Sequence, residues 1–147
     1  MFLDGSSFHR VLWDDDAAKL AKPKDMKRVV LCTGKVYYDL LQERRERKIK
    51  NVTILRLEQL YPFPYTALET ELKQFKNAEI VWCQEEPENM GAWQYADRKI
   101  EMVLTKLKHK YARPVYAGRS AAASPATGSA KRHAAEQAKL VDEALSV

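Results

Sequence analysis

The chain has 147 residues, of which 46% are hydrophobic and 31% are charged, and its formal net charge is +5 at pH 7. This length suits one domain with its own core, and the composition excludes an intrinsically disordered chain. No apolar run approaches the roughly 20 residues of a membrane-spanning helix, and the first residues lack the basic and apolar regions of a secretory signal.

The positive charge gathers in two stretches, residues 43–50 and residues 106–119. A basic surface can bind nucleic acid, but the chain has no recognition motif and no basic–aromatic interleaving for stacking bases. We therefore expect no nucleic-acid partner. A solvated helix end or another anionic partner accounts for these charges.

Taken in order, the chain begins with a linker segment, residues 1–25. Residues 7–13 of this segment predict a short strand, and His9 lacks a nearby partner for catalysis or metal binding. Apolar and β-branched runs then predict four strands, at residues 28–33, 52–57, 78–83 and 113–117.

Helical periodicity follows each of these strands. The helices are expected to begin near Gly34, Pro64, Trp93 and Ser129, and the last is expected to end near Leu145. Alternating strands and helices predict that residues 26–147 form an α/β domain, a mostly parallel sheet flanked by helices.

The stretch from 78 to 93 combines a strand, two adjacent carboxylates and a helix start. We expect Glu85 and Glu86 to lie in an acidic turn as solvated or ion-paired carboxylates, since no catalytic separation can be inferred for them. Gly91 indicates a positive φ or a close backbone approach. Trp93 begins the apolar stripe of the helix and is expected to be buried or to lie at a dimer contact.

The two cysteines, Cys32 and Cys83, each lie in an apolar strand-like run. Neither has a second cysteine or a histidine at ligand spacing, so the sequence predicts no metal site. We expect two buried thiols, which suits a reducing compartment.

Lys35 and Arg119 are candidates for an anion site. Lys35 opens a helix after the first long strand and Arg119 follows the last strand, so both are expected at the carboxyl edge of the sheet. They could hold the phosphate of a regulatory nucleotide or of coenzyme A. Alternatively, Arg119 pairs with Glu85 or Glu86, which are expected at the same edge and would repel an anion.

Several motifs, in the same order along the chain, resemble the C-terminal domain of the thiamine-diphosphate-dependent, decarboxylating component of 2-oxoglutarate dehydrogenase. The strongest are Trp-Cys-Gln-Glu-Glu-Pro at 82–87 and Asn-Met-Gly-Ala-Trp at 89–93. The others are Ser-Phe-His-Arg-Val-Leu at 7–12, Cys-Thr-Gly-Lys-Val-Tyr-Tyr-Asp-Leu at 32–40, Arg-Leu-Glu-Gln-Leu-Tyr-Pro-Phe-Pro at 56–64, Arg-Pro-Val-Tyr-Ala-Gly-Arg at 113–119 and Ser-Pro-Ala-Thr-Gly at 124–128.

The resemblance implies a transketolase-type C-terminal domain. It also implies that the full subunit decarboxylates 2-oxoglutarate in the tricarboxylic acid cycle, using thiamine diphosphate and Mg²⁺, and succinylates a lipoyl group. This chain has no Gly-Asp-Gly magnesium loop, and the family's substrate histidines lie in upstream domains. No residue here therefore inherits a catalytic or cofactor-binding role, and we expect this chain alone to be inactive.

The family also implies partners: other domains of the subunit, a homodimer and the dihydrolipoyl succinyltransferase core. Some members bind a nucleotide or acetyl-coenzyme A as an allosteric regulator near this domain. The expected compartment is the bacterial cytoplasm or the mitochondrial matrix. Two alternatives stay open, the same domain of 2-oxoadipate dehydrogenase and a free-standing α/β module that binds a small molecule.

Overall fold

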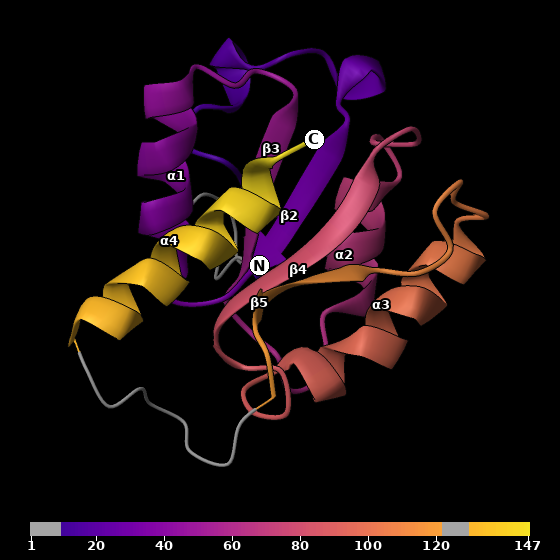
Figure 1. Cartoon of the computed structure of the whole chain (residues 1–147). Coiled ribbons are helices and arrows are strands. Elements are labelled where there is room, and N and C mark those ends of the chain that lie inside the picture. The colour runs from indigo at the N-terminus through magenta and orange to yellow at the C-terminus, as the bar shows by residue number, and fades with distance from the viewer. Residues whose placement is uncertain (1–9, 122–129) are drawn as a thin grey trace.

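The computed structural model describes residues 10–121 and 130–147, and these form one sheet between two layers of helices (Figure 1). The strands are β1 (Val11–Leu12), β2 (Arg28–Cys32), β3 (Val52–Leu57), β4 (Glu79–Pro87) and β5 (Val115–Arg119). The α-helices are α1 (Val36–Arg47), α2 (Tyr65–Leu72), α3 (Trp93–Lys106) and α4 (Ala130–Leu145). Two short 3₁₀ turns, Ala17–Lys19 and Pro23–Asp25, precede β2.

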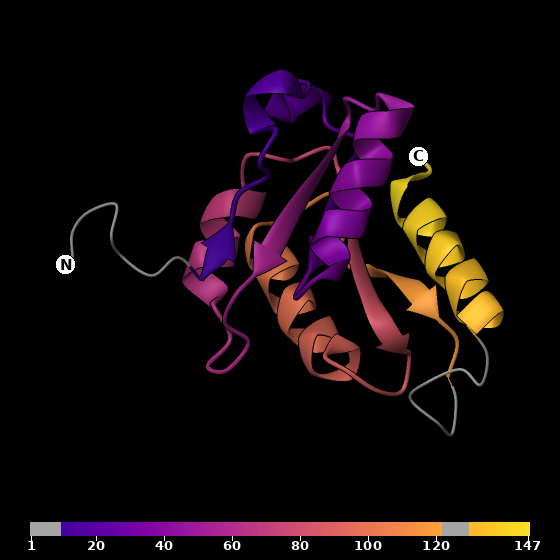
Figure 2. The same cartoon turned by 90° about the vertical axis from the view of Figure 1, so that its left-hand side faces the viewer.

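The strand order in the sheet is β1-β3-β2-β4-β5. The four longer strands are parallel, and only β1 runs antiparallel, beside β3. The predicted α/β class with a mostly parallel sheet is confirmed. The carboxyl ends of the four parallel strands lie at one edge, and the turns that lead into α1, α2 and α3 follow three of them (Figure 2).

The sheet carries a separate apolar core on each face. On one face, Leu31, Ile80 and Trp82 pack against α2 and α3. On the other, Val30 and Ile54 pack against α1 and α4. Because successive side chains of a strand point to opposite faces, β2, β3 and β4 serve both cores, which explains their continuous apolar runs.

Two strand boundaries and the buried face of one helix differ from the sequence prediction. The strand predicted at 113–117 lies at Val115–Arg119. Helical spacing in the final helix predicts Ala134 and Ala138 on the same buried face as Val141, but both alanines are exposed and Leu140 is buried. The largest difference is β4, which continues through Glu85 and Glu86 to Pro87. The expected acidic turn is therefore wrong, because Pro87 still pairs with Arg119 of β5 beyond a register shift.

The predicted linker segment takes part in the sheet, since Val11 and Leu12 pair with Leu57 and Arg56 of β3. The domain boundary after residue 25 stays a prediction. Among the described residues, no helix is long and apolar enough to cross a membrane. His9 and the motif at 124–128 lie outside the described residues.

Candidate functional site

The turn between β4 and α3 is organised by one buried amide, that of Gln84. Its Oε1 accepts hydrogen bonds from Trp82 Nε1 and from the backbone N–H of Trp93, both at 2.9 Å. Its Nε2 donates to the carbonyl oxygens of Met90 at 2.7 Å and Pro87 at 3.0 Å. One side chain thus satisfies polar groups on a strand, a turn and a helix start, which fixes the course of residues 87–93.

Gly91 lies in this turn with a φ of 69°, so the predicted positive φ is confirmed. A Cβ at Gly91 would lie 3.0 Å from both Cβ and Oε1 of Glu86. Trp93 is buried, and its ring lies 5.3 Å from that of Tyr116, centroid to centroid. The turn therefore needs glycine for its backbone and places the indole in the core.

Both candidate anion-binding residues lie beside Glu85, at the carboxyl edge where they were predicted. Lys35 Nζ is 3.9 Å from Glu85 Oε2, and the Lys35 side chain is 84% exposed. The guanidinium of Arg119 donates to the Glu85 backbone carbonyl, and its side chain is only 8% exposed. The structure thus brings Lys35, Glu85 and Arg119 together, while the anion site itself stays a prediction.

The ion pair of Arg119 differs from the one expected. Its carboxylate partner is Glu136 of α4, at 3.1 Å, rather than the carboxylate of Glu85 or Glu86. Arg119 also donates to Gln137 Oε1 at 3.0 Å, and Gln137 Nε2 donates to Glu85 Oε2 at 2.9 Å. Because α4 supplies Glu136 and Gln137, an incoming anion would have to displace an existing network around Arg119.

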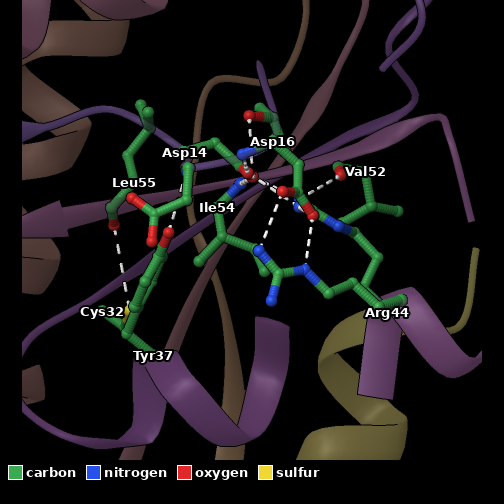
Figure 3. A network of polar contacts seen from close by, with 11 residues as sticks. Asp14, Asp16, Cys32, Tyr37, Arg44, Val52, Ile54 and Leu55 are labelled. Atoms are coloured by element: carbon green, nitrogen blue, oxygen red, sulfur yellow. Dashed lines mark hydrogen bonds and ion pairs between the residues drawn. The ribbon is translucent and has the colours of Figure 1, made fainter. Parts of the chain in front are cut away.

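A second polar network, which the sequence analysis missed, joins Asp14 to Arg44 (Figure 3). Arg44 is 1% exposed and Asp14 is 5% exposed. Arg44 Nη2 donates to Asp14 Oδ1 at 2.7 Å, and Arg44 Nη1 donates to the carbonyl of Val52 at 3.1 Å. Asp14 Oδ2 accepts from the N–H of Ile54 at 2.9 Å. The pair therefore fastens the segment before β2 to both α1 and β3.

Arg44 had been assigned to a solvated basic helix end, and that interpretation is wrong for this residue. Burial opposes the charge of Arg44, but the hydrogen bond and the charge of Asp14 outweigh it and raise the pKa of Arg44 above its ordinary value. Arg45 lies beyond it, 55% exposed, and donates to Asp16 at 2.7 and 2.9 Å. The hydrogen bond from Arg45 lowers the pKa of Asp16 to about 2.

This pKa predicts an acid-sensitive contribution to stability. The pKa of Asp16 is about 2 in the folded chain against an ordinary 3.8, so the stabilisation is present above pH 4 and is lost as pH falls towards 2. We expect Asp16→Asn to flatten the fall in unfolding free energy over this range, measured by urea denaturation at several pH values. Parallel curves for the wild type and Asp16→Asn would contradict this role.

A family model described as 2-oxoglutarate dehydrogenase C-terminal matches residues 1–145. The chain belongs to this family. The family resemblance inferred from the motifs at 82–93 is therefore confirmed.

Relatives with this domain are much longer than the present chain. The chain is 55% identical over 146 residues to the 2-oxoglutarate dehydrogenase E1 component of Brucella anthropi, a match that covers 95% of the chain and 15% of the relative. The E1 components of Brucella ovis and Brucella abortus are also 55% identical, with 14% of each covered. The chain thus spans about 15% of the length of the curated relatives it matches.

A solved structure of an inactive β4 tetramer of a split-gene transketolase has the same fold. The match has a TM-score of 0.51 and 18% sequence identity, and it covers 85% of this chain and 41% of that one. At this identity, the likeness supports the transketolase-like fold alone.

The described part of this 2-oxoglutarate dehydrogenase C-terminal domain holds no cluster of His, Cys, Asp or Glu suited to a metal ion. Cys32 and Cys83 are buried free thiols, as predicted. Burial raises the pKa of both, that of Cys83 to about 12, so neither is ready to act as a thiolate nucleophile. The polar groups of the site organise turns and helix contacts.

Proposed function

We propose that this domain is the C-terminal structural domain of the E1 subunit of a 2-oxoglutarate dehydrogenase. The observation that carries the proposal is the 55% identity to E1 components across 95% of the chain. The role of the domain is to form part of the folded subunit and to present the carboxyl edge of its sheet to partners or regulators.

The reaction belongs to the complete subunit. That subunit would decarboxylate 2-oxoglutarate with thiamine diphosphate and Mg²⁺ and pass the succinyl group to a lipoyl group of the dihydrolipoyl succinyltransferase core. Because this chain has no Gly-Asp-Gly magnesium loop, the domains that precede this one would bind those cofactors. The complete subunit would form a homodimer in the bacterial cytoplasm or the mitochondrial matrix.

The first test concerns the isolated chain. We expect no thiamine diphosphate binding in the micromolar range in the presence of Mg²⁺, measured by isothermal titration calorimetry, because the sequence has no Gly-Asp-Gly magnesium loop. The control is the full-length subunit, which should bind the cofactor. Micromolar binding by the 147-residue chain would contradict the assignment.

The full-length subunit distinguishes the remaining alternatives. The proposal predicts a higher kcat/KM for decarboxylation of 2-oxoglutarate than of 2-oxoadipate. The opposite preference would identify the domain as part of a 2-oxoadipate dehydrogenase. A gene that encodes only this domain, and whose product binds a small molecule, would favour a free-standing module.

A regulatory role would involve Lys35 and Arg119. If a nucleotide or acetyl-coenzyme A binds at this edge, Lys35→Ala and Arg119→Ala should each weaken its binding to the full-length dimer, because each removes a donor to phosphate. Lys73→Ala, an exposed lysine of α2's C-terminal end, is the matched control and should change nothing. Unchanged affinity in both edge variants, with the fold intact by circular dichroism, would leave these residues a structural role only.

A further inference from the structure

Four aromatic residues, which we call the aromatic face, lie at the turns that lead into two helices: Tyr61, Phe63 and Tyr65 at the start of α2, and Tyr95 at the start of α3. Phe63 is buried and its ring lies 5.0 Å from that of Tyr65 and 6.3 Å from that of Tyr95, between ring centroids. The tyrosines are open to solvent, with Tyr61 at 85%, Tyr65 at 37% and Tyr95 at 36%. The buried ring of Phe63 thus packs beside two of these phenols, and Tyr61 lies on the same connection that carries Phe63.

The aromatic face belongs to the carboxyl edge of the sheet. Tyr65 is the first residue of α2, and Tyr95 lies in the first turn of α3. Only Leu68 and Leu72 of α2 are buried, so Tyr65 is left partly open at its start. Exposed tyrosines grouped around an apolar centre are typical of interfaces, since the ring packs while the hydroxyl still finds a polar partner.

The chain reaches this same edge from its N-terminal side. The backbone N–H of Glu58 donates to the carbonyl of Arg10 at 2.8 Å, and Val11 pairs with Leu57. Figure 2 shows β1 beside the end of β3, next to the connection that carries Tyr61. Arg10, where the described part of the chain begins, therefore lies beside Glu58, which follows the end of β3 and comes three positions before Tyr61.

The relatives indicate what precedes it. The matching family is a C-terminal one, and the chain covers only 15% of the E1 component of Brucella anthropi. If the proposed function holds, the rest of the subunit precedes this domain in the chain and is joined to it on the N-terminal side of residue 10. Contacts between domains in one chain typically bury about 600–1,500 Å², an area that needs a surface of this kind.

We propose that the aromatic face docks the preceding domains of the same E1 subunit. Tyr61, the most exposed of the tyrosines, becomes buried in this contact. Tyr65 and Tyr95 flank it and lose their exposure to solvent. The inference rests on the proposed function, because the occupant is the upstream part of that subunit.

Photo-cross-linking in the full-length subunit tests the docking. p-Benzoylphenylalanine replaces Tyr61 in one variant and Met102 in a control, because Met102 is 60% exposed but lies two turns along α3 from Tyr95. We expect irradiation of the variant at position 61 to yield a product of single-subunit mass, with a peptide from the preceding domains joined to position 61. The control should give no such peptide.

Two results would overturn the inference. A product of doubled mass would show that the aromatic face contacts a second copy of the subunit. The absence of any cross-link at position 61 would show that the aromatic face is exposed to solvent. Decarboxylation of 2-oxoglutarate, measured on the same samples, separates this outcome from failure of the proposed function. If the subunit is active but gives no cross-link, the docking proposal alone is contradicted. If the subunit gives the cross-link but has no activity on 2-oxoglutarate, the proposed function is contradicted.

Discussion

Replacement of Asp14 by alanine is expected to lower the unfolding free energy of this chain by about 3–5 kcal/mol. The guanidinium of Arg44 is 1% exposed, and Asp14 supplies its nearest negative charge. Without that carboxylate, the buried cation keeps, among the described residues, only the Asp16 carboxylate at 3.4 Å and the Val52 carbonyl, and the N–H of Ile54 loses its acceptor. Urea denaturation of the wild type and the Asp14→Ala variant at pH 7 measures the loss.

Two further variants test whether the loss of stability comes from the buried charge of Arg44 after the Asp14 carboxylate is removed. Asp15→Ala removes an exposed carboxylate one residue away and should change the unfolding free energy by less than about 0.5 kcal/mol. The double variant Asp14→Ala/Arg44→Met removes the buried cation as well, so it should be more stable than Asp14→Ala alone. A double variant that loses the sum of both single effects would show that the charge is not the cause.

Most of the fold follows from local patterns in the sequence. The apolar run at 52–57 became β3 with the same bounds, because a strand buried on both faces needs no alternation to be recognised. The helices α1 and α3 began close to Lys35 and at Trp93, where a glycine with positive φ precedes each helix. These features depend on neighbours along the chain, which the sequence displays directly.

The hydrogen-bond networks around Arg44 and Gln84 join residues that are neighbours in space rather than along the chain, so the sequence did not predict them. Asp14 and Arg44 are 30 positions apart, and each lies in a charged run that is equally compatible with solvent. Gln84 was treated as part of a motif, although its amide binds five other groups across the turn. Gln84 comes directly after the apolar run at 80–83 and before two glutamates, so no clear signal in the sequence indicates that its amide is a buried hydrogen-bond centre.

At the carboxyl edge of the sheet, too, the sequence predicts some features and not others. That Lys35, Glu85 and Arg119 share an edge follows from parallel strands, and this was predicted correctly. The partner of Arg119 was not, because Glu136 comes from α4, and no sequence pattern fixes which turn of a later helix lies over β5. Strand order therefore predicts the place of a residue better than it predicts the contacts of that residue.

Trp93→Ala is the second substitution with a large expected effect, a loss of about 3–5 kcal/mol in unfolding free energy. Trp93 is buried in the core between the sheet and α2 and α3, beside the ring of Tyr116. Alanine would leave a cavity bounded by the β4–α3 turn, which cannot collapse freely because Gln84 ties the turn to the Trp93 backbone. Both the lost packing of the indole and the cavity that it leaves should therefore lower the unfolding free energy.

Trp13→Ala is the matched control, since Trp13 is 66% exposed and its indole N–H reaches only the exposed carboxylate of Glu71. Its loss should stay below about 1 kcal/mol. Chemical denaturation of both variants gives the comparison. If Trp93→Ala also loses less than about 1 kcal/mol, the indole contributes little to the core of the isolated chain, and its principal contact would then be sought at the dimer interface of the full-length subunit.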